Sequence, residues 1–148
     1  MAQYDLLVIG SGPAGQKAAV QAAKLGKKVG IVERRAVVGG VSTNTGTIPS
    51  KALREAVLYL SGFRQRNLYG AGYRLKETVT IEDLAFRANH IIKNEIEIVQ
   101  NQMARNRIDL IYGEASFVDP HRLLIQHAGT STEHRAHVIV IAVGTEPS

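Results

Sequence analysis

The feature that most constrains this 148-residue chain is a glycine-rich hexapeptide that lies between an apolar run and a helical pattern. Residues 6–9, Leu-Leu-Val-Ile, form a continuous apolar run, which is typical of a strand buried on both faces of a parallel sheet. Gly-Ser-Gly-Pro-Ala-Gly follows at residues 10–15, and residues 14–25 then show helical periodicity. A second apolar run over residues 29–32 ends at Glu33, 18 positions after the last glycine. The pattern predicts one complete βαβ unit.

The three glycines and the acid have the spacing of a dinucleotide-binding fingerprint. Gly10 suits a tight turn, Gly12 lets the backbone approach a pyrophosphate, and Gly15 permits close packing of helix on strand. The helix N-terminus supplies free N–H groups for the phosphates. Glu33 is placed to accept hydrogen bonds from both hydroxyls of an adenosine ribose, and it would repel a 2′-phosphate. The fingerprint therefore favours FAD or NAD over NADP, with a glycine-rich turn of an unrelated α/β protein as the alternative.

The rest of the chain predicts further helices and then a β-rich region. A polar segment with glycines at Gly39, Gly40 and Gly46 precedes Pro49 and a helix over residues 52–63. Residues 64–80 are predicted to form a loop, and apolar residues at spacings of three and four predict a long helix over residues 81–103. Short β-rich runs follow at residues 108–112, 115–118, 123–125 and 138–141. The predicted fold class is α/β, a Rossmann-like βαβ fold with a parallel sheet and a small antiparallel β-meander.

Composition excludes several functions. The chain has no cysteine, so it cannot form disulfides, zinc–thiolate sites or iron–sulfur centres. Its net charge of +5 comes from scattered basic residues, which favours a solvated surface over a nucleic-acid site. His134 and His137 have the spacing of helical metal ligands but fall in a predicted strand or turn, so we expect no metal site. We also expect no signal peptide and no membrane span, and hence a cytoplasmic protein.

Residues 39–51, Gly-Gly-Val-Ser-Thr-Asn-Thr-Gly-Thr-Ile-Pro-Ser-Lys, resemble the active-site stretch of the flavoprotein disulfide reductases. The pattern there is Gly-Gly-x-Cys-x-Asn-x-Gly-Cys-x-Pro-Ser-Lys, and only its two cysteines differ, being replaced by Ser42 and Thr47. The similarity continues in residues 112–117, Tyr-Gly-Glu-Ala-Ser-Phe, and in residues 141–145, Ile-Ala-Val-Gly-Thr. It therefore covers the whole chain and favours FAD as the cofactor.

The two replacements exclude disulfide reduction, because hydroxyl groups scarcely ionise near neutral pH and form no redox-active bridge. Thr47 within Gly-Thr-Ile-Pro-Ser-Lys resembles the soluble pyridine nucleotide transhydrogenases of bacteria, although these typically keep a cysteine where Ser42 stands. The resemblance implies hydride transfer between NADH and NADP⁺ through enzyme-bound FAD, with NAD(H) and NADP(H) as substrates. It also implies that Lys51 approaches flavin N5.

The fingerprint and the resemblance together define the predicted site. The positions expected to take part in catalysis are Lys51 and the two former cysteine positions, Thr47 and Ser42. The residues expected to contact FAD are Gly10, Gly12, Pro13, Ala14, Gly15, Glu33, Arg34, Gly39, Gly40, Val41, Ser42, Gly46, Thr47, Lys51, Gly113, Glu114, Ala115, Ala142, Val143, Gly144 and Thr145.

By the same resemblance, residues 1–148 form the N-terminal part of an FAD domain. The nicotinamide-binding and C-terminal dimerisation domains are absent, so the isolated chain is expected to be inactive and the full-length protein to be a homodimer. Two alternatives remain open. One is another FAD-dependent pyridine nucleotide oxidoreductase of the superfamily, similar to dihydrolipoyl dehydrogenase or a diaphorase. The other is a non-catalytic module that binds an adenine nucleotide.

Overall fold

The computed structural model describes residues 2–145 and divides into two compact units. The sheet unit comprises Met1–Val41 and Ile96–Ser148, and the helical unit comprises Ser42–Glu95. The sheet unit contains β1 (Ala2–Ile9), α1 (Pro13–Lys24), β2 (Val29–Glu33), β3 (Asp109–Tyr112), β4 (Glu114–Asp119), β5 (Arg122–His127) and β6 (Thr130–Ile141). The helical unit contains α3 (Thr47–Leu60) and α4 (Arg66–Tyr69), while α2 (Gly40–Asn44) and α5 (Ile81–Arg105) contribute residues to both units.

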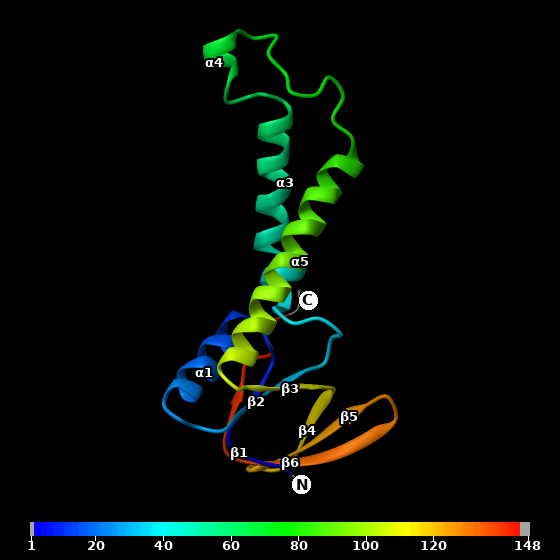
Figure 1. Cartoon of the computed structure of the whole chain (residues 1–148). Coiled ribbons are helices and arrows are strands. Elements are labelled where there is room, and N and C mark those ends of the chain that lie inside the picture. Colours follow the sequence, from blue (N-terminus) through cyan, green and yellow to red (C-terminus); the bar gives the residue numbers. More distant parts are fainter. Residues whose placement is uncertain (1, 146–148) are drawn as a thin grey trace. The chain divides into compact units, whose positions relative to one another are not determined.

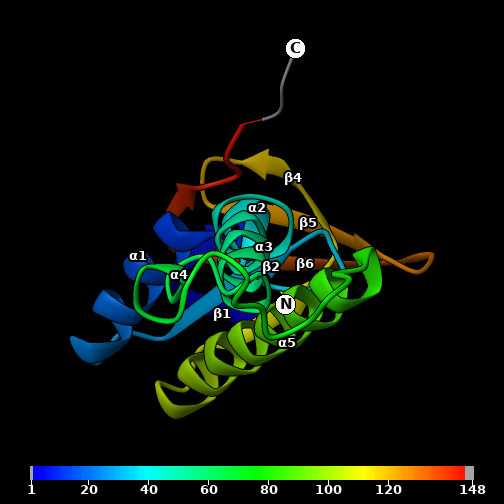
Figure 2. The same cartoon turned by 90° about the horizontal axis from the view of Figure 1, so that it is seen from above.

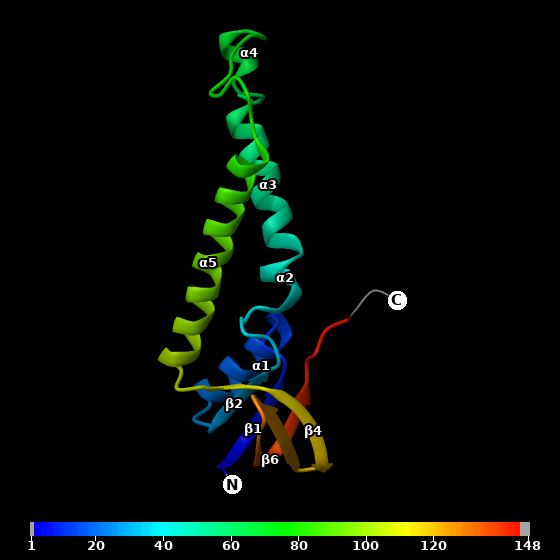
Figure 3. The same ribbon diagram turned by 90° about the vertical axis from the view of Figure 1, so that its right-hand side faces the viewer.

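The sheet has six strands in the order β3-β2-β1-β6-β5-β4 (Figure 1). Strands β3, β2, β1 and β6 run parallel, and Leu7 of β1 lies opposite Gly30 on one side and Ile139 on the other. The first part of β6 pairs antiparallel with β5, which pairs antiparallel with β4, so these three strands form a meander (Figure 3). The predicted fold class, a parallel sheet with an antiparallel meander, is confirmed.

The predicted βαβ unit is also confirmed, with small differences at its ends. β1 extends back to Ala2, and β2 is buried along its whole length, as its continuous apolar run predicts. Helix α1 begins at Pro13, where proline's missing N–H costs nothing, and lies beside β1 and β2 (Figure 2). Gly26, with φ of +76°, follows its C-terminus.

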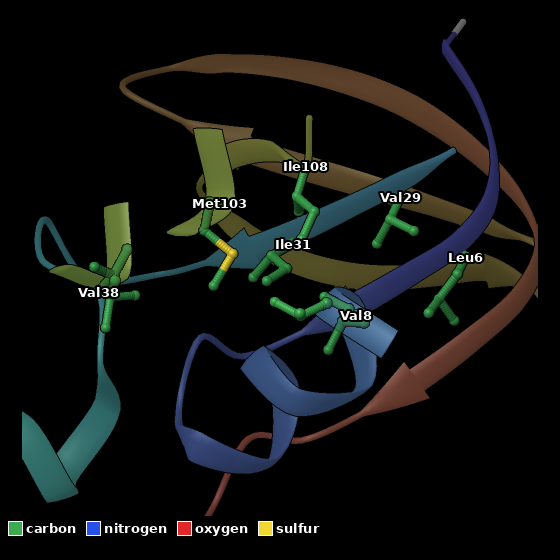
Figure 4. Packing of buried hydrophobic residues seen from close by; sticks show 10 residues of the cluster. Leu6, Val8, Val29, Ile31, Val38, Met103 and Ile108 are labelled. Atoms are coloured by element: carbon green, nitrogen blue, oxygen red, sulfur yellow. The ribbon is translucent and has the colours of Figure 1, made fainter. Parts of the chain in front are cut away.

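Apolar side chains on the two faces of the sheet form two core clusters. The first packs α1 and the end of α5 against one face, and it includes Val8, Ile31 and Met103 (Figure 4). The second lies between the parallel strands and the meander, where Leu7, Leu123 and Ile125 are almost completely buried. Both faces of β1 are therefore covered, which accounts for its unbroken apolar sequence.

The helical unit confirms two predicted helices and adds two short ones. Helix α3 begins at Thr47, earlier than the predicted residue 52, and ends at Leu60 rather than at residue 63. Helix α5 matches the predicted helix over residues 81–103 within two residues. The short helices α2 and α4 fall in segments predicted to be irregular, because four or five residues are too few to show a helical period.

The other difference concerns β6. It was predicted over residues 138–141 but begins at Thr130, directly after a turn in which Ala128 and Gly129 both have positive φ. Residues 130–137 are mostly polar and exposed, so they lack the apolar run by which a buried strand is recognised. His134 and His137 thus lie in a strand.

Candidate functional site

Four segments of the predicted site follow the ends of the parallel strands. Gly10 follows β1, Arg34 follows β2, Gly113 follows β3 and Ala142 follows β6. Because these strands are parallel, their carboxyl ends meet at one edge of the sheet. Strand β1 has β2 on one side and β6 on the other, so the order of strands switches there. Open α/β sheets bind their ligands at such a switch point.

Gly10 makes the turn after β1 against the end of β6. Its φ of +105° lies in the region that glycine favours, and a Cβ there would lie 2.3 Å from the carbonyl oxygen of Ala142. Backbone hydrogen bonds fix both segments, from the Gly10 amide to the Val32 carbonyl at 2.8 Å and from the Ala142 amide to the Ile9 carbonyl at 2.8 Å. No larger residue fits at Gly10 without displacing the backbone of residue 142.

Gly12, the N-cap of α1, faces open space. A Cβ at this position would meet no atom within 4 Å, and no side chain caps the helix. Its φ of −67° is accessible to any residue, so glycine is not required here by backbone conformation. A Cβ on Gly40, by contrast, would lie 3.0 Å from the Gly12 Cα atom. Two glycine backbones thus lie close together beside a helix N-terminus, and this arrangement fits a pyrophosphate.

Glu33 ends β2 with its side chain only 6% exposed. One carboxylate oxygen, Oε2, accepts hydrogen bonds from the Ser11 amide at 3.1 Å and the Ser11 hydroxyl at 2.5 Å. The other, Oε1, accepts one from the Arg35 amide at 2.9 Å. A carboxylate has about four acceptor positions, so about one remains for a ligand hydroxyl in this arrangement.

Ser11 is the residue that sequence reasoning missed. It is completely buried, and besides binding Glu33 its hydroxyl accepts a hydrogen bond from the Gly39 amide at 3.1 Å. Its carbonyl oxygen accepts one from the Gln16 side chain at 2.8 Å. The signal available in the sequence was a hydroxyl residue between the first two fingerprint glycines, with an acid at the end of the next strand.

The segment after β3 joins the same region. The Gly113 amide donates a hydrogen bond to the Glu33 carbonyl at 2.9 Å. Gly113 has φ of +150°, and a Cβ there would lie 2.6 Å from Ile125 and 2.7 Å from the Gln126 carbonyl oxygen. The remaining predicted residues of the sheet unit lie after β2 or β6, or in the first two residues of α1, α2 or β4. They are mostly exposed, namely Pro13, Ala14, Arg34, Val41, Glu114, Ala115, Val143, Gly144 and Thr145.

The other predicted site residues belong to the helical unit. Ser42 lies in α2, Gly46 is the N-cap of α3, and Thr47 is the first residue of that helix. Lys51 is the fifth residue of α3, and both Lys51 and Thr47 are exposed. The Ser50 hydroxyl donates a hydrogen bond to the Gly46 carbonyl at 3.0 Å, which anchors the first turn.

Other features of residues 2–145 offer weaker candidates. A surface hollow of about 500 Å³ on the meander is lined by Asp119, Pro120, His121, Arg122 and Arg135. Two of its charges already pair, since Arg122 lies 2.6 Å from Asp119, and Arg122 also lies 3.6 Å from Glu133. Within the described part of the chain, no three His, Asp or Glu side chains cluster to hold a metal ion. No helix in that range has the length and apolarity to cross a bilayer.

Comparison with known proteins adds an independent finding. A family model described as FAD dependent oxidoreductase matches residues 5–139. A soluble pyridine nucleotide transhydrogenase of Mycobacterium bovis (strain BCG / Pasteur 1173P2) is 55% identical over 150 residues, which cover 100% of this chain and 32% of the relative. A protein of the same name from Colwellia psychrerythraea is 40% identical over 97% of this chain and 31% of its own length. The chain therefore spans about a third of the length of these curated relatives.

A solved structure shares the fold. The Cu(II) complex of the HOCl-induced flavoprotein disulfide reductase RclA from Escherichia coli matches with a TM-score of 0.79 at 27% sequence identity. The match covers 97% of this chain and 29% of that protein.

Proposed function

This chain belongs to the FAD dependent oxidoreductase family, and we propose that it binds the adenosine diphosphate half of FAD at the carboxyl ends of β1 and β2. In this proposal the pyrophosphate lies at Gly12 and receives hydrogen bonds from amide groups in the first turn of α1. Glu33 accepts a hydrogen bond from the adenosine ribose. The segments that begin at Gly113 and Ala142 border the same site.

The observation that carries this proposal is the open space at Gly12. The other two fingerprint glycines have no room for a side chain, since a Cβ on Gly10 would lie 2.3 Å from a backbone oxygen and a Cβ on Gly15 would lie 2.0 Å from one. Gly12 alone of the three has room for a side chain and a φ that permits one. Packing within the described chain therefore does not account for glycine there, whereas a phosphate in that space does.

For the longer protein we propose hydride exchange between NADH and NADP⁺, giving NAD⁺ and NADPH. Bound FAD would supply the hydride chemistry. The relatives that are 55% and 40% identical carry the name of this activity, and Ser42 and Thr47 provide no thiol for a disulfide reductase. We also propose a cytoplasmic homodimer, with nicotinamide-binding and dimerisation domains outside these 148 residues.

Lys51, Thr47 and Ser42 have proposed roles on the flavin side of that protein. Lys51 is exposed, and its ammonium group can stabilise negative charge on a reduced flavin ring. The hydroxyls of Thr47 and Ser42 can donate hydrogen bonds but cannot relay electrons as thiolates do.

The test is a titration of the chain with FAD, followed by flavin fluorescence, for the wild type and Gly12→Val. The matched control is Gly72→Val, because Gly72 is also a glycine with nothing within 4 Å of an added Cβ. We expect binding by the wild type and the control, and none by Gly12→Val with unchanged circular dichroism. Equal binding by all three would contradict the proposed pyrophosphate position. A chain that binds ADP but does not bind FAD would favour the alternative of a non-catalytic adenine-nucleotide module.

A further inference from the structure

Ser11 is the only described residue whose side chain is hydrogen-bonded both to Glu33 and to the Gly39 turn. Its hydroxyl hydrogen goes to Glu33 Oε2 at 2.5 Å, and its oxygen accepts from the Gly39 amide at 3.1 Å. Its own amide binds the same carboxylate oxygen at 3.1 Å. One buried side chain thus joins the turn after β1, the last residue of β2 and the residue before α2.

We propose that Ser11 is a positioning residue for the adenosine ribose, and this inference rests on the proposed FAD site. Two donors from Ser11 hold Oε2, so the Glu33 carboxylate is fixed in one orientation before a ligand arrives. The acceptor position that remains lies on Oε1, which carries one donor, the Arg35 amide. Ser11 thereby determines which carboxylate oxygen is available to a ribose hydroxyl.

The same hydroxyl ties the ribose contact to the phosphate contact. Gly39 has φ of +103° and precedes Gly40. Gly40 lies so close to Gly12 that a Cβ on Gly40 would be 3.0 Å from the Gly12 Cα atom. Holding the Gly39 amide therefore holds the turn that approaches Gly12. Removal of the Ser11 hydroxyl should loosen both contacts, although it touches no ligand atom in this proposal.

The experiment measures binding of ADP and of 2′,3′-dideoxy-ADP to the 148-residue chain by calorimetry. The variants are Ser11→Ala, Glu33→Gln and their combination. Ser116→Ala is the control, because Ser116 is an exposed serine of the sheet unit whose hydroxyl makes one long contact, 3.4 Å to the Leu124 carbonyl. We expect Ser11→Ala to weaken ADP binding by about tenfold, because a displaced Glu33 carboxylate would lose its hydrogen bond from the ribose, and a hydrogen bond to a charged group usually contributes this much.

The decisive quantity is the dissociation constant of 2′,3′-dideoxy-ADP divided by that of ADP, which measures how much the ribose hydroxyls contribute to binding. The ratio should fall in Ser11→Ala and in Glu33→Gln, and the double variant should show no further fall. If Ser11 only stabilised the fold, its replacement would weaken the binding of both ligands equally and leave the ratio unchanged. In the ligand-free chain, hydrogen exchange at the Gly39 amide should become faster in Ser11→Ala.

Each outcome separates the two proposals. A ratio lost in Glu33→Gln but kept in Ser11→Ala overturns the role of Ser11 alone. Absence of ADP binding by the wild type, or an unchanged ratio in Glu33→Gln, overturns the adenosine site and this inference with it. If Ser11→Ala fails to fold, Ser11→Cys keeps nearly the same volume with only a weak donor, and the same fall in the ratio is expected of it.

Discussion

A Cβ atom on Gly15 would lie 2.0 Å from the carbonyl oxygen of Gly10. The backbone of α1 therefore crosses the end of β1 with no space for even a methyl group. The third fingerprint glycine is explained by packing alone.

Gly15→Ala should consequently destabilise the chain. The obstructing atom belongs to the backbone, so the helix must move, and we expect a loss of about 1–3 kcal/mol in the free energy of unfolding. Urea unfolding followed by circular dichroism measures it. Gly72→Ala, at an open position, should show no loss. Equal stability of Gly15→Ala and the wild type would mean that the helix does not lie this close to the strand.

Tyr4 predicts a pH dependence of stability. Its side chain is 5% exposed and its hydroxyl donates a hydrogen bond to Asp109 at 3.0 Å. Burial, with the hydrogen bond to Asp109, raises the pKa of Tyr4 to about 12 from 10.0. Because the folded state binds the proton more tightly, this contribution is complete below pH 10 and is lost as the pH rises from 10 towards 12.

Tyr4→Phe should therefore be less stable than the wild type by about 1 kcal/mol at pH 7, the typical value of one hydrogen bond. The difference should shrink above pH 10, because only the wild type can lose the stabilising protonated form. Urea unfolding at several pH values measures this. Tyr59→Phe is the control, since Tyr59 is 61% exposed. A difference that does not change with pH would contradict the assignment to Tyr4.

The outer edge of β6 predicts self-association of the isolated chain. Residues 138–141 pair with β1 on one side, while β5 pairs only with the earlier part of β6. Val138 and Ile141 there are 55% and 63% exposed. Unpaired strand edges with apolar side chains promote association between chains.

Val138→Lys should reduce this association, because a charge on an open edge opposes pairing. Leu25→Lys, which replaces a 69% exposed leucine after α1, should leave it unchanged. Sedimentation velocity over a range of concentrations distinguishes the two. A wild-type chain that stays monomeric at every concentration would contradict the prediction that this strand edge promotes association.

The hydroxyl residues at positions 42 and 47 predict a spectral property of the longer protein. Ser42 and Thr47 stand where a disulfide reductase has its two cysteines, so we expect no long-wavelength charge-transfer band between thiolate and flavin on reduction. Lipoamide and glutathione reductase activities should not exceed a control without enzyme. Detection of either activity would refute the interpretation of the two replaced positions.

Local patterns predicted the elements whose cause is local. The run from Leu6 to Ile9, the helix that follows the fingerprint glycines and the stripe of α5 each depend on residues close in sequence, and each of these predicted elements is confirmed. The first half of β6 was missed because its strand character comes from pairing with β5 rather than from its own polar sequence.

The same distinction holds in the candidate site. The spacing of Glu33 from the glycines indicated an acid at the end of β2, and the structure places one there. The contacts of that acid with Ser11 and Arg35 depend on how two strand ends meet in space. The periodicity of a sequence indicates local structure and does not reveal such contacts. The roles of the predicted ligand-binding residues remain predictions.

The strand order has a consequence for synthesis on the ribosome. Leu6 of β1 pairs with Val29 but also with Val138, which is made 132 residues after it. During translation, β1 can acquire its first neighbour early, while its second edge stays open until residues 138–141 have been made. Pairings of such long sequence separation form slowly. The nascent chain must therefore keep a central, apolar strand half-paired, and the turn at Gly10 can close against Ala142 only at the end of that interval.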